Sequence, residues 1–347
     1  MKICVLGLDG AAMDLIADER LVNLRRLMEV GLYGQLENVV PHTEVSSWIC
    51  MATSRDQDSS ADSTSSPALA IWDHLAAAGR QSVLIGVPPS YPPRRVNGVS
   101  IGAFLASGAA ASSPTRDFAW PPEIQSELRE LLGDYPMDEK DFAATNSAAS
   151  PDELRDEIIL LSDRQWQAGR LFLGKHQWDY FHFVDSGLEF LLHLQTQANT
   201  LEESVARNVA ADYLAALDEQ VGSVLELLDD QTIVLVLSTQ GTQLSTGGSG
   251  TSSVLNREGA AGPGADHAAP LGVFVLAAPN CPLTSEYHGA HLIDMAPTLL
   301  DLAGYEIPAS MQGRSLVAGL EKKDGGESSA ESDEKLLLDR LSGLGYV

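Results

Sequence analysis

The sequence predicts an α/β protein with a doubly wound, mostly parallel sheet and helices on both faces. Two observations predict this class. Short, wholly apolar runs such as Val5–Leu8 and Ile233–Leu237 are typical of buried parallel strands, which are covered on both faces. Segments with helical spacing of apolar residues alternate with these runs, and such alternation indicates helices packed on both sides of one sheet.

The N-terminal half supplies the first elements. The expected strands are a first one that contains Cys4 and Val5–Leu8, then 36–40 and 82–87, and the expected helices are 11–30, 46–53, 68–79 and 121–132. Gly31 and Gly79 follow two of these helices as stop signals, and Pro121 suits a first helical turn. Segments 54–66, 88–93 and 102–115 are rich in small, polar or proline residues and are expected to be loops.

The C-terminal half continues the alternation. Helices are expected at 151–175, 188–195, 201–228 and 292–303, and strands at 180–184, 232–237 and 273–278. Ser150 precedes the first of these helices as an N-cap, and acidic residues follow it in the first turn. Segment 241–264 is rich in Gly, Ser and Thr and is expected to be a flexible loop.

The chain is long enough for one large domain. Its 347 residues are 44% hydrophobic, which allows one large α/β domain or two smaller ones; we expect one domain, over 1–320, with an insert at 102–150. A charged linker is expected at 321–334 and a helical tail at 335–347. The first apolar run is too short for a signal peptide and no run reaches the length of a membrane span, so a cytoplasmic protein is expected.

The charge balance restricts the partners. The chain has 48 acidic and 22 basic residues, a formal net charge of −26. Such a surface repels nucleic-acid backbones and anionic membranes, so neither is expected as a partner. A lysine-poor, acidic surface is also what a high-salt cytoplasm favours, and a halophilic source is one interpretation; an ordinary acidic protein is the other.

Polar residues follow the two most apolar strands. Asp9 ends the first and Thr239-Gln240 ends the second. In open α/β sheets, ligands bind at the carboxyl ends of strands. A carboxylate at one strand end and only an alcohol and an amide at the other suggest a hydrolase architecture with part of its chemistry missing.

A series of segments in order resembles the type I phosphodiesterase / nucleotide pyrophosphatase family of the alkaline phosphatase superfamily, over nearly the whole chain. These segments are 5–10 (VLGLDG), 21–31 (LVNLRRLMEVG), 71–79 (IWDHLAAAG), 87–93 (VPPSYPP), 178–181 (WDYF), 294–304 (DMAPTLLDLAG) and 344–347 (LGYV). The resemblance implies an alkaline-phosphatase-like fold in which 102–150 is a reduced cap. It also implies a two-metal phosphoric ester hydrolase, in which the metals clamp the attacking and leaving oxygens.

The resemblance assigns metal ligands residue by residue. Asp9 matches the ligand after the first strand. Glu189 stands at the position of an Asp ligand, and His193 matches the His four residues later on the same helix face. His267 is the expected distal His ligand; the competitors for this role are His288 and His291. The alternatives without a metal are Asp9 as a helix cap, Glu189 and His193 as a pair on the helix surface, and His267 as a solvated side chain.

Other positions depart from the family pattern. Thr239-Gln240-Gly241 replaces an expected Asp-His-Gly, and neither an alcohol nor an amide is a good zinc ligand. Glu44 stands at the position of the nucleophile, with the hydroxyls of Thr43 and Ser46 nearby. Glu44 could also hold a cation on Asp9. The Gly expected after the motif is Ser54.

Two functions remain open. The first is a degenerate homologue with little or no two-metal hydrolysis, which retains at most one zinc or other divalent metal on Glu189, His193 and His267 and binds a phosphate-bearing ligand or a protein partner. The second is an active metal-dependent phosphodiesterase or phosphatase with a rearranged site, in which Thr43 or Ser46 is the nucleophile.

Overall fold

The fold is known from a computed structural model that describes residues 1–38, 44–56, 68–106, 117–132, 137–138, 146, 149–197, 203–241, 271–279, 281 and 284–318. The expected linker (321–334) and helical tail (335–347) lie outside the described residues, as do most of the expected loops 54–66 and 241–264.

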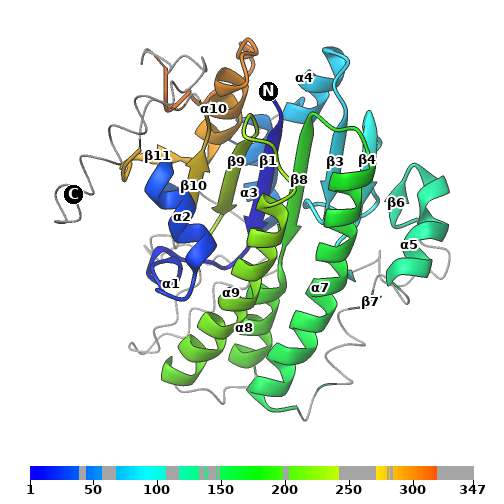
Figure 1. The fold of residues 1–347 in the computed structure, drawn as a ribbon, viewed down its shortest axis with the longest axis vertical. Coiled ribbons are helices and arrows are strands. Elements are labelled where there is room, and N and C mark those ends of the chain that lie inside the picture. The colour runs from blue at the N-terminus through cyan, green and yellow to red at the C-terminus, as the bar shows by residue number, and fades with distance from the viewer. Residues whose placement is uncertain are drawn as a thin grey trace, which may run out of the picture.

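One mixed sheet forms the centre of the molecule, with the strand order β11-β2-β10-β9-β1-β8-β3-β4-β6 (Figure 1). Its strands are β1 (Ile3–Leu8), β2 (Leu32–Glu37), β3 (Ser82–Ile85), β4 (Gly98–Ile101), β6 (Ala119–Trp120), β8 (Tyr180–Asp185), β9 (Ile233–Ser238), β10 (Gly272–Ala277) and β11 (Ala290–His291). The central strand β1 pairs in parallel with β8 and β9, and among these strands only β10 and β6 run antiparallel to their neighbours. The predicted fold class, doubly wound and mostly parallel, is confirmed.

Helices cover both faces of this sheet. One apolar core joins it to α1 (Met13–Ile16), α2 (Val22–Val30), α5 (Gln125–Leu132), α7 (Pro151–Lys175), α8 (Gly187–Gln197) and α9 (Glu203–Leu225). A second core on the other face joins it to α3 (Glu44–Thr53), α4 (Ile71–Ala77) and α10 (Met295–Leu302). Single 3₁₀ turns, η2 (Pro122–Ile124) and η3 (Leu292–Asp294), precede α5 and α10.

Several elements differ from the prediction. The helix expected over 11–30 is two helices, because Asp18 accepts a hydrogen bond from the backbone N–H of Arg20 and stabilises a turn between them. The strand expected at 36–40 begins earlier, at Leu32. Strands β4, β6 and β11 were not predicted, since they have only two to four residues. Within the expected cap, β6 extends the main sheet, and β5 (Leu105–Ala106) pairs with β7 (Met137–Asp138).

The start of α2 is held by a distant carboxylate. Asp218 of α9 is buried and accepts hydrogen bonds from the backbone N–H groups of Asn23 and Leu24, at 2.9 and 2.8 Å. These amides lie in the first turn of α2 and have no partner within the helix. A side chain of another helix therefore provides the N-terminal cap of α2.

The end of α3 has a backbone conformation that usually requires glycine. Ser54 has a φ of 52°, and its Oγ donates to the carbonyl of Ile293 at 2.6 Å and accepts from the N–H of Gly313 at 3.0 Å. The family resemblance implies a glycine at this position. The serine adopts the same conformation, and its hydroxyl joins α3 to the α10 region.

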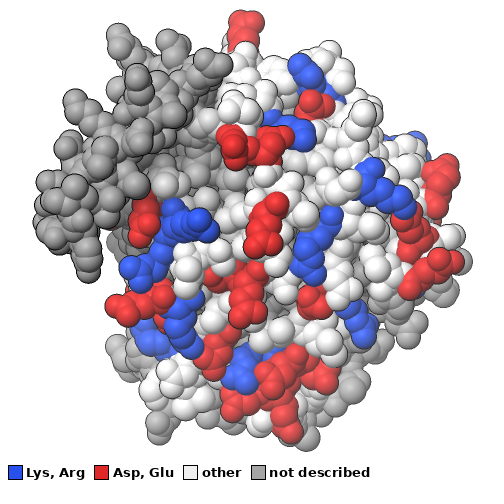
Figure 2. Space-filling view, viewed as in Figure 1, with Lys and Arg blue, Asp and Glu red and all other residues white. Residues whose placement is uncertain are grey.

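Charged side chains of both signs alternate over the face that carries α2, α7 and α9 (Figure 2). Asp212 accepts from Arg20 at 2.7 Å and from Arg155 at 3.1 Å, so one carboxylate joins the α1–α2 turn, α7 and α9. Among the described helices, none is long and apolar enough to cross a membrane.

Candidate functional site

The candidate site lies at the carboxyl edge of the sheet, where β1, β8 and β9 end side by side. The backbone N–H of Asp9 donates to the carbonyl of Asp185 at 2.9 Å, and Gly10 forms a bridge with Gly241. These contacts extend the parallel pairing beyond the strands. They bring the polar residues after β1, β8 and β9 to one place, as expected for a ligand crevice in an α/β sheet.

Asp9 is fully buried beside α3. The indole Nε1 of Trp48 donates to its carboxylate, at 3.1 Å from Oδ1 and 3.0 Å from Oδ2. Gly7 makes this contact possible, because a Cβ at Gly7 would lie 2.5 Å from Cη2 of Trp48. Packing therefore explains the glycine in the segment VLGLDG: Gly7 leaves space for the indole of Trp48, which donates to the carboxylate of Asp9.

Glu189 and Gln240 form a second polar contact at this edge. Nε2 of Gln240 donates to Oε1 of Glu189 at 3.1 Å. Glu189 belongs to the first turn of α8 and His193 to the next turn, and both side chains are half-buried. The amide that replaces an expected imidazole is thus oriented with its N–H toward a carboxylate.

Thr239 is fully buried between these two contacts, and its Oγ1 has no hydrogen-bond partner among the described residues. Its carbonyl accepts from Nδ2 of Asn38 at 3.0 Å, and the same amide donates to Oγ of Ser47. The ends of β2 and β9 and the first turns of α3 are therefore held together through Asn38.

Asp185 is a residue that the sequence analysis missed. It is fully buried and accepts from the backbone N–H of Gly187, from Nε1 of Trp166 and from the hydroxyls of Ser162 and Tyr213. Burial raises its pKa, and the four hydrogen bonds oppose that shift. The signal was an aspartate directly after an apolar run, as at Asp9.

Asp185 also provides a second pair of residues with the spacing expected of the metal ligands. The family resemblance implies an Asp and a His ligand four residues apart, and Asp185 and Glu189 have this spacing as well as Glu189 and His193. Asp185 ends β8, next to Asp9 on β1, whereas Glu189 is already on α8. The carboxylate at the strand end is therefore Asp185, engaged by four donors from α7, α8 and α9.

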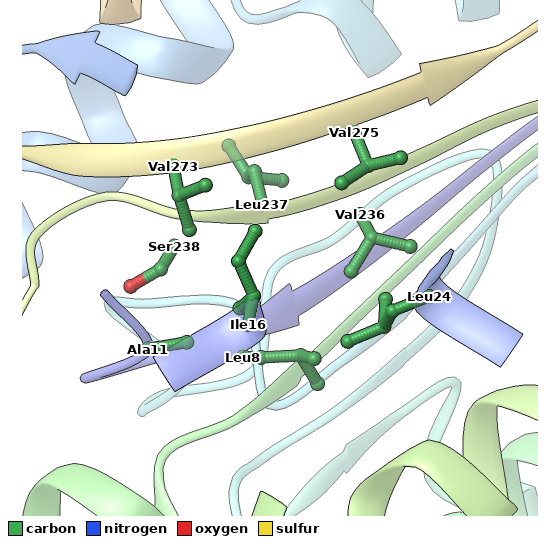
Figure 3. Close-up of a pocket in the computed structure, with 9 residues that line it drawn as sticks. All are labelled: Leu8, Ala11, Ile16, Leu24, Val236, Leu237, Ser238, Val273 and Val275. Atoms are coloured by element: carbon green, nitrogen blue, oxygen red, sulfur yellow. The ribbon is translucent and has the colours of Figure 1, made fainter. Parts of the chain in front are cut away.

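A small apolar pocket lies between the sheet and α1 and α2 (Figure 3). It is lined by Leu8, Ala11, Ile16, Leu24, Val236, Leu237, Ser238, Val273 and Val275. Among these, only Ser238 contributes a polar side chain, and its hydroxyl already donates to the carbonyl of Gln240. This pocket is a packing gap of the core and lacks the convergent polar groups of a ligand site.

Both the sequence and the fold of this chain are similar to those of known proteins. Residues 3–60 match the family model described as type I phosphodiesterase / nucleotide pyrophosphatase. The fold is similar to that of a protein in the alkaline phosphatase superfamily from Vibrio parahaemolyticus, at 16% identity and a TM-score of 0.52 over 92% of this chain and 70% of that chain. The chain therefore shares its fold with a protein of the alkaline phosphatase superfamily, and the match to the phosphodiesterase family model covers residues 3–60.

Other solved members of the fold confirm the architecture. The phosphonate monoester hydrolase SpPMH from Silicibacter pomeroyi is 15% identical, with a TM-score of 0.53 over 91% of this chain and 75% of that chain. BT1596, a 2-O GAG sulfatase, is 11% identical, with a TM-score of 0.54 over 91% and 73%. No curated protein matches the sequence. At such identities the likeness concerns the fold.

The described residues do not fit a two-metal site. No group of three or more His, Cys, Asp or Glu side chains among them is arranged to hold a metal ion. Position 239 offers an alcohol, and position 240 an amide that donates to Glu189.

Several predicted site residues fall outside the described part. Thr43 and His267 are not described, nor is the side chain of Glu44, so their roles stay predictions. Ser46 is half-buried in the first turn of α3. The competitors for the distal ligand, His288 and His291, are exposed. His291 is on β11. Three strands, β2, β10 and β9, lie between β11 and the central strand β1.

Proposed function

We propose that the protein is a degenerate homologue of metal-dependent phosphodiesterases and phosphatases, which carries out little or no two-metal hydrolysis and binds a phosphate-bearing ligand or a protein partner at the carboxyl ends of the strands. The observation that carries this proposal is the contact of Gln240 with Glu189, at 3.1 Å. A neutral amide N–H can satisfy a carboxylate, but it can neither polarise a phosphoryl oxygen as a metal does nor lower the pKa of a bound water.

The contacts of Asp9 support the same proposal. Its carboxylate accepts from the indole of Trp48, again a neutral donor, and the neighbouring Thr239 offers a hydroxyl in place of a carboxylate. Loss of both an Asp and a His from one metal site removes the clamp and the activation of the nucleophile together, and each contributes orders of magnitude to rate.

We further propose that any retained metal is a single zinc or other divalent ion on Glu189, His193 and His267, as the family resemblance implies. The cytoplasm is the proposed compartment. The net charge of −26 supports a high-salt source and disfavours nucleic acids and anionic membranes as partners.

The test combines metal content with turnover. Purified protein is incubated with Zn²⁺, Mn²⁺ or Mg²⁺, its metal content is measured by mass spectrometry, and it is assayed on p-nitrophenyl phosphate and bis-p-nitrophenyl phosphate. We expect at most one equivalent of metal and turnover no faster than that of Asp9→Ala. Inorganic phosphate, the simplest probe of the binding role, should raise the melting temperature of the wild type.

Two equivalents of metal together with turnover lost in Asp9→Ala would overturn the proposal and establish the active alternative. In that case Thr43→Ala and Ser46→Ala identify the nucleophile, since only the variant that lacks it loses turnover. The exposed Asp14 pairs with Arg207 on the helical face, and Asp14→Ala is the matched control for Asp9→Ala.

A further inference from the structure

Three polar atoms lie buried without a hydrogen-bond partner near α4, away from the carboxyl edge. They are Nε2 of His182, Oγ of Ser82 and Nε of Arg94, and none has a partner among the described residues. His182 is fully buried and Ser82 nearly so. An unsatisfied buried polar group is costly, and its presence points to a missing partner.

The ring of Trp72 on α4 lies near two of these groups, those of Arg94 and His182. Its centroid lies 5.3 Å from Cζ of Arg94 and 6.4 Å from the centroids of His182 and Tyr180. Ser82 is the cross-strand partner of Tyr180. Because side chains alternate along a strand, Tyr180 and His182 point to the same face of the sheet, the face that α4 covers.

Arg94 brings a positive charge that no described carboxylate pairs with directly. Its guanidinium forms no ion pair in the described part of the chain, and burial lowers its pKa, while the charge of Asp73 acts in the opposite direction. The carboxylate of Asp73 accepts from the backbone N–H of Ala70 at the start of α4. A half-buried cation over an aromatic ring therefore lacks an anion.

His182 is neutral and contributes one N–H. Burial, and then the charge of Arg94, lower its pKa to about 3. Nδ1 lies 3.0 Å from the hydroxyl of Tyr180, whose pKa burial raises so that it stays protonated. When the tyrosine donates to Nδ1, the proton of the imidazole is on Nε2. Three donors then have no acceptor among the described residues: Nε of Arg94 and Nε2 of His182, both near Trp72, and Oγ of Ser82 on the strand beside Tyr180.

We propose that this place between α4 and strands β3 and β8 is a binding site for a halide ion, chloride in the cell, held by Arg94, His182 and Ser82 against Trp72. A halide accepts hydrogen bonds and donates none, so it matches a set of donors. A water molecule needs two to four partners and would have to find acceptors for its own protons. The negative charge also offsets the guanidinium of Arg94.

The experiment compares halides with an anion too large for the site. Wild-type protein in potassium gluconate is titrated with chloride or bromide at constant ionic strength, and its melting temperature is followed. We expect a saturable rise in the melting temperature. In Arg94→Gln the affinity for the halide should fall at least tenfold, whereas Arg95→Gln is the matched control and should respond as the wild type. Arg95 is the next residue along the chain and lies over Trp120, at 4.9 Å.

A second measurement does not depend on the folding of any variant. Crystals of the wild type soaked in bromide should show an anomalous peak between Arg94, His182 and Ser82. Equal melting temperatures in chloride and gluconate, an equal chloride response of Arg94→Gln and wild type, or only a water molecule in the bromide-soaked crystals would each overturn the proposal.

Discussion

The indole N–H of Trp48 lies 3.0 Å from Oδ2 and 3.1 Å from Oδ1 of Asp9, and both side chains are fully buried. One donor thus bridges the two oxygens of a carboxylate at the end of the central strand. The contact ties α3 to β1 and fixes the orientation of Asp9. Its strength is measurable, because each partner can be removed alone.

The contact predicts coupling between Trp48 and Asp9. Trp48→Phe should destabilise the protein by about 1–3 kcal/mol, because it leaves a buried carboxylate without this donor, in addition to the loss of packing. Asp9→Ala should reduce that cost, so the double-mutant cycle should give a coupling of roughly 0.5–3 kcal/mol. The measurement is urea unfolding of the wild type, both single variants and the double variant.

Trp178 provides the control for this cycle. It is also buried and donates to a carbonyl, that of Leu173 at 3.2 Å, but it precedes β8 and so lies at the opposite edge of the sheet from Asp9. Trp178→Phe and Asp9→Ala should have additive effects. If the effects of Trp48→Phe and Asp9→Ala on the free energy of unfolding were additive as well, the indole would contribute nothing to stability through its contact with the carboxylate.

Gly7 sets the space for the same indole. In Gly7→Ala the new Cβ would lie 2.5 Å from Trp48 and 2.9 Å from Val184, and the overpacking should cost about 1–3 kcal/mol. A Cβ added at Gly174 on α7 would meet no atom within 4 Å, so Gly174→Ala should stabilise the protein by about 0.5–1 kcal/mol through helix propensity. Thermal or urea unfolding checks both, and equal effects of the two substitutions would contradict the packing role of Gly7.

Asp185 predicts a pH dependence of known sign. Burial raises its pKa in the folded state, so the folded state binds its proton more tightly than the unfolded state does, where the pKa is about 3.9. The unfolding free energy should therefore fall as pH rises from about 4 to the raised pKa and lose nothing more from this group above it. Asp185→Asn lacks this change, so the stability of the wild type relative to Asp185→Asn should decrease with rising pH.

Asp229 is the control of opposite sign. The hydroxyl of Thr232 and other donors lower its pKa, so its contribution is lost as pH falls. The stability of the wild type relative to Asp229→Asn should therefore increase with rising pH. Urea unfolding at a series of pH values measures both, and a relative stability that is flat or rising for Asp185→Asn would contradict the prediction.

The replaced pair at 239–240 predicts a gain of metal binding. The double variant Thr239→Asp and Gln240→His restores a carboxylate and an imidazole beside Asp9, and both are good zinc ligands. We expect its zinc content to exceed that of the wild type by up to one equivalent, measured by mass spectrometry after dialysis. The conservative pair Thr239→Ser and Gln240→Asn should leave the metal content unchanged. Equal zinc in all three proteins would show that positions 239 and 240 are not ligand positions in this chain.

Local signals made parts of the fold predictable. The helix expected at 151–175 has those bounds in the structure, because its start is encoded by neighbours: Ser150 accepts from the N–H of Glu153, and Glu153 accepts from the N–H of Ser150. The strand ends after β1 and β9 were also visible, and their parallel pairing places Asp9 beside Thr239.

Other features depended on contacts that no local pattern contains. The break between α1 and α2 needs the turn at Asp18 and the distant Asp218. Asp185 escaped notice because the strand was expected to end at Val184, and its role comes from α7 and α9, which lie elsewhere in the sequence. Trp48 reaches Asp9 only through the space left by Gly7, which no spacing rule reveals.

The cap that Asp218 gives to α2 has a consequence for how the chain is assembled. The backbone N–H groups of Asn23 and Leu24 donate to a carboxylate that lies 195 and 194 residues later in the sequence. The first turn of α2 therefore gains its hydrogen-bond acceptor only when α9 has packed against it. Contacts of such large separation slow folding. A fragment that ends before α9, such as the segment 3–60 that matches the family model, lacks this cap and should leave α2 frayed at its first turn.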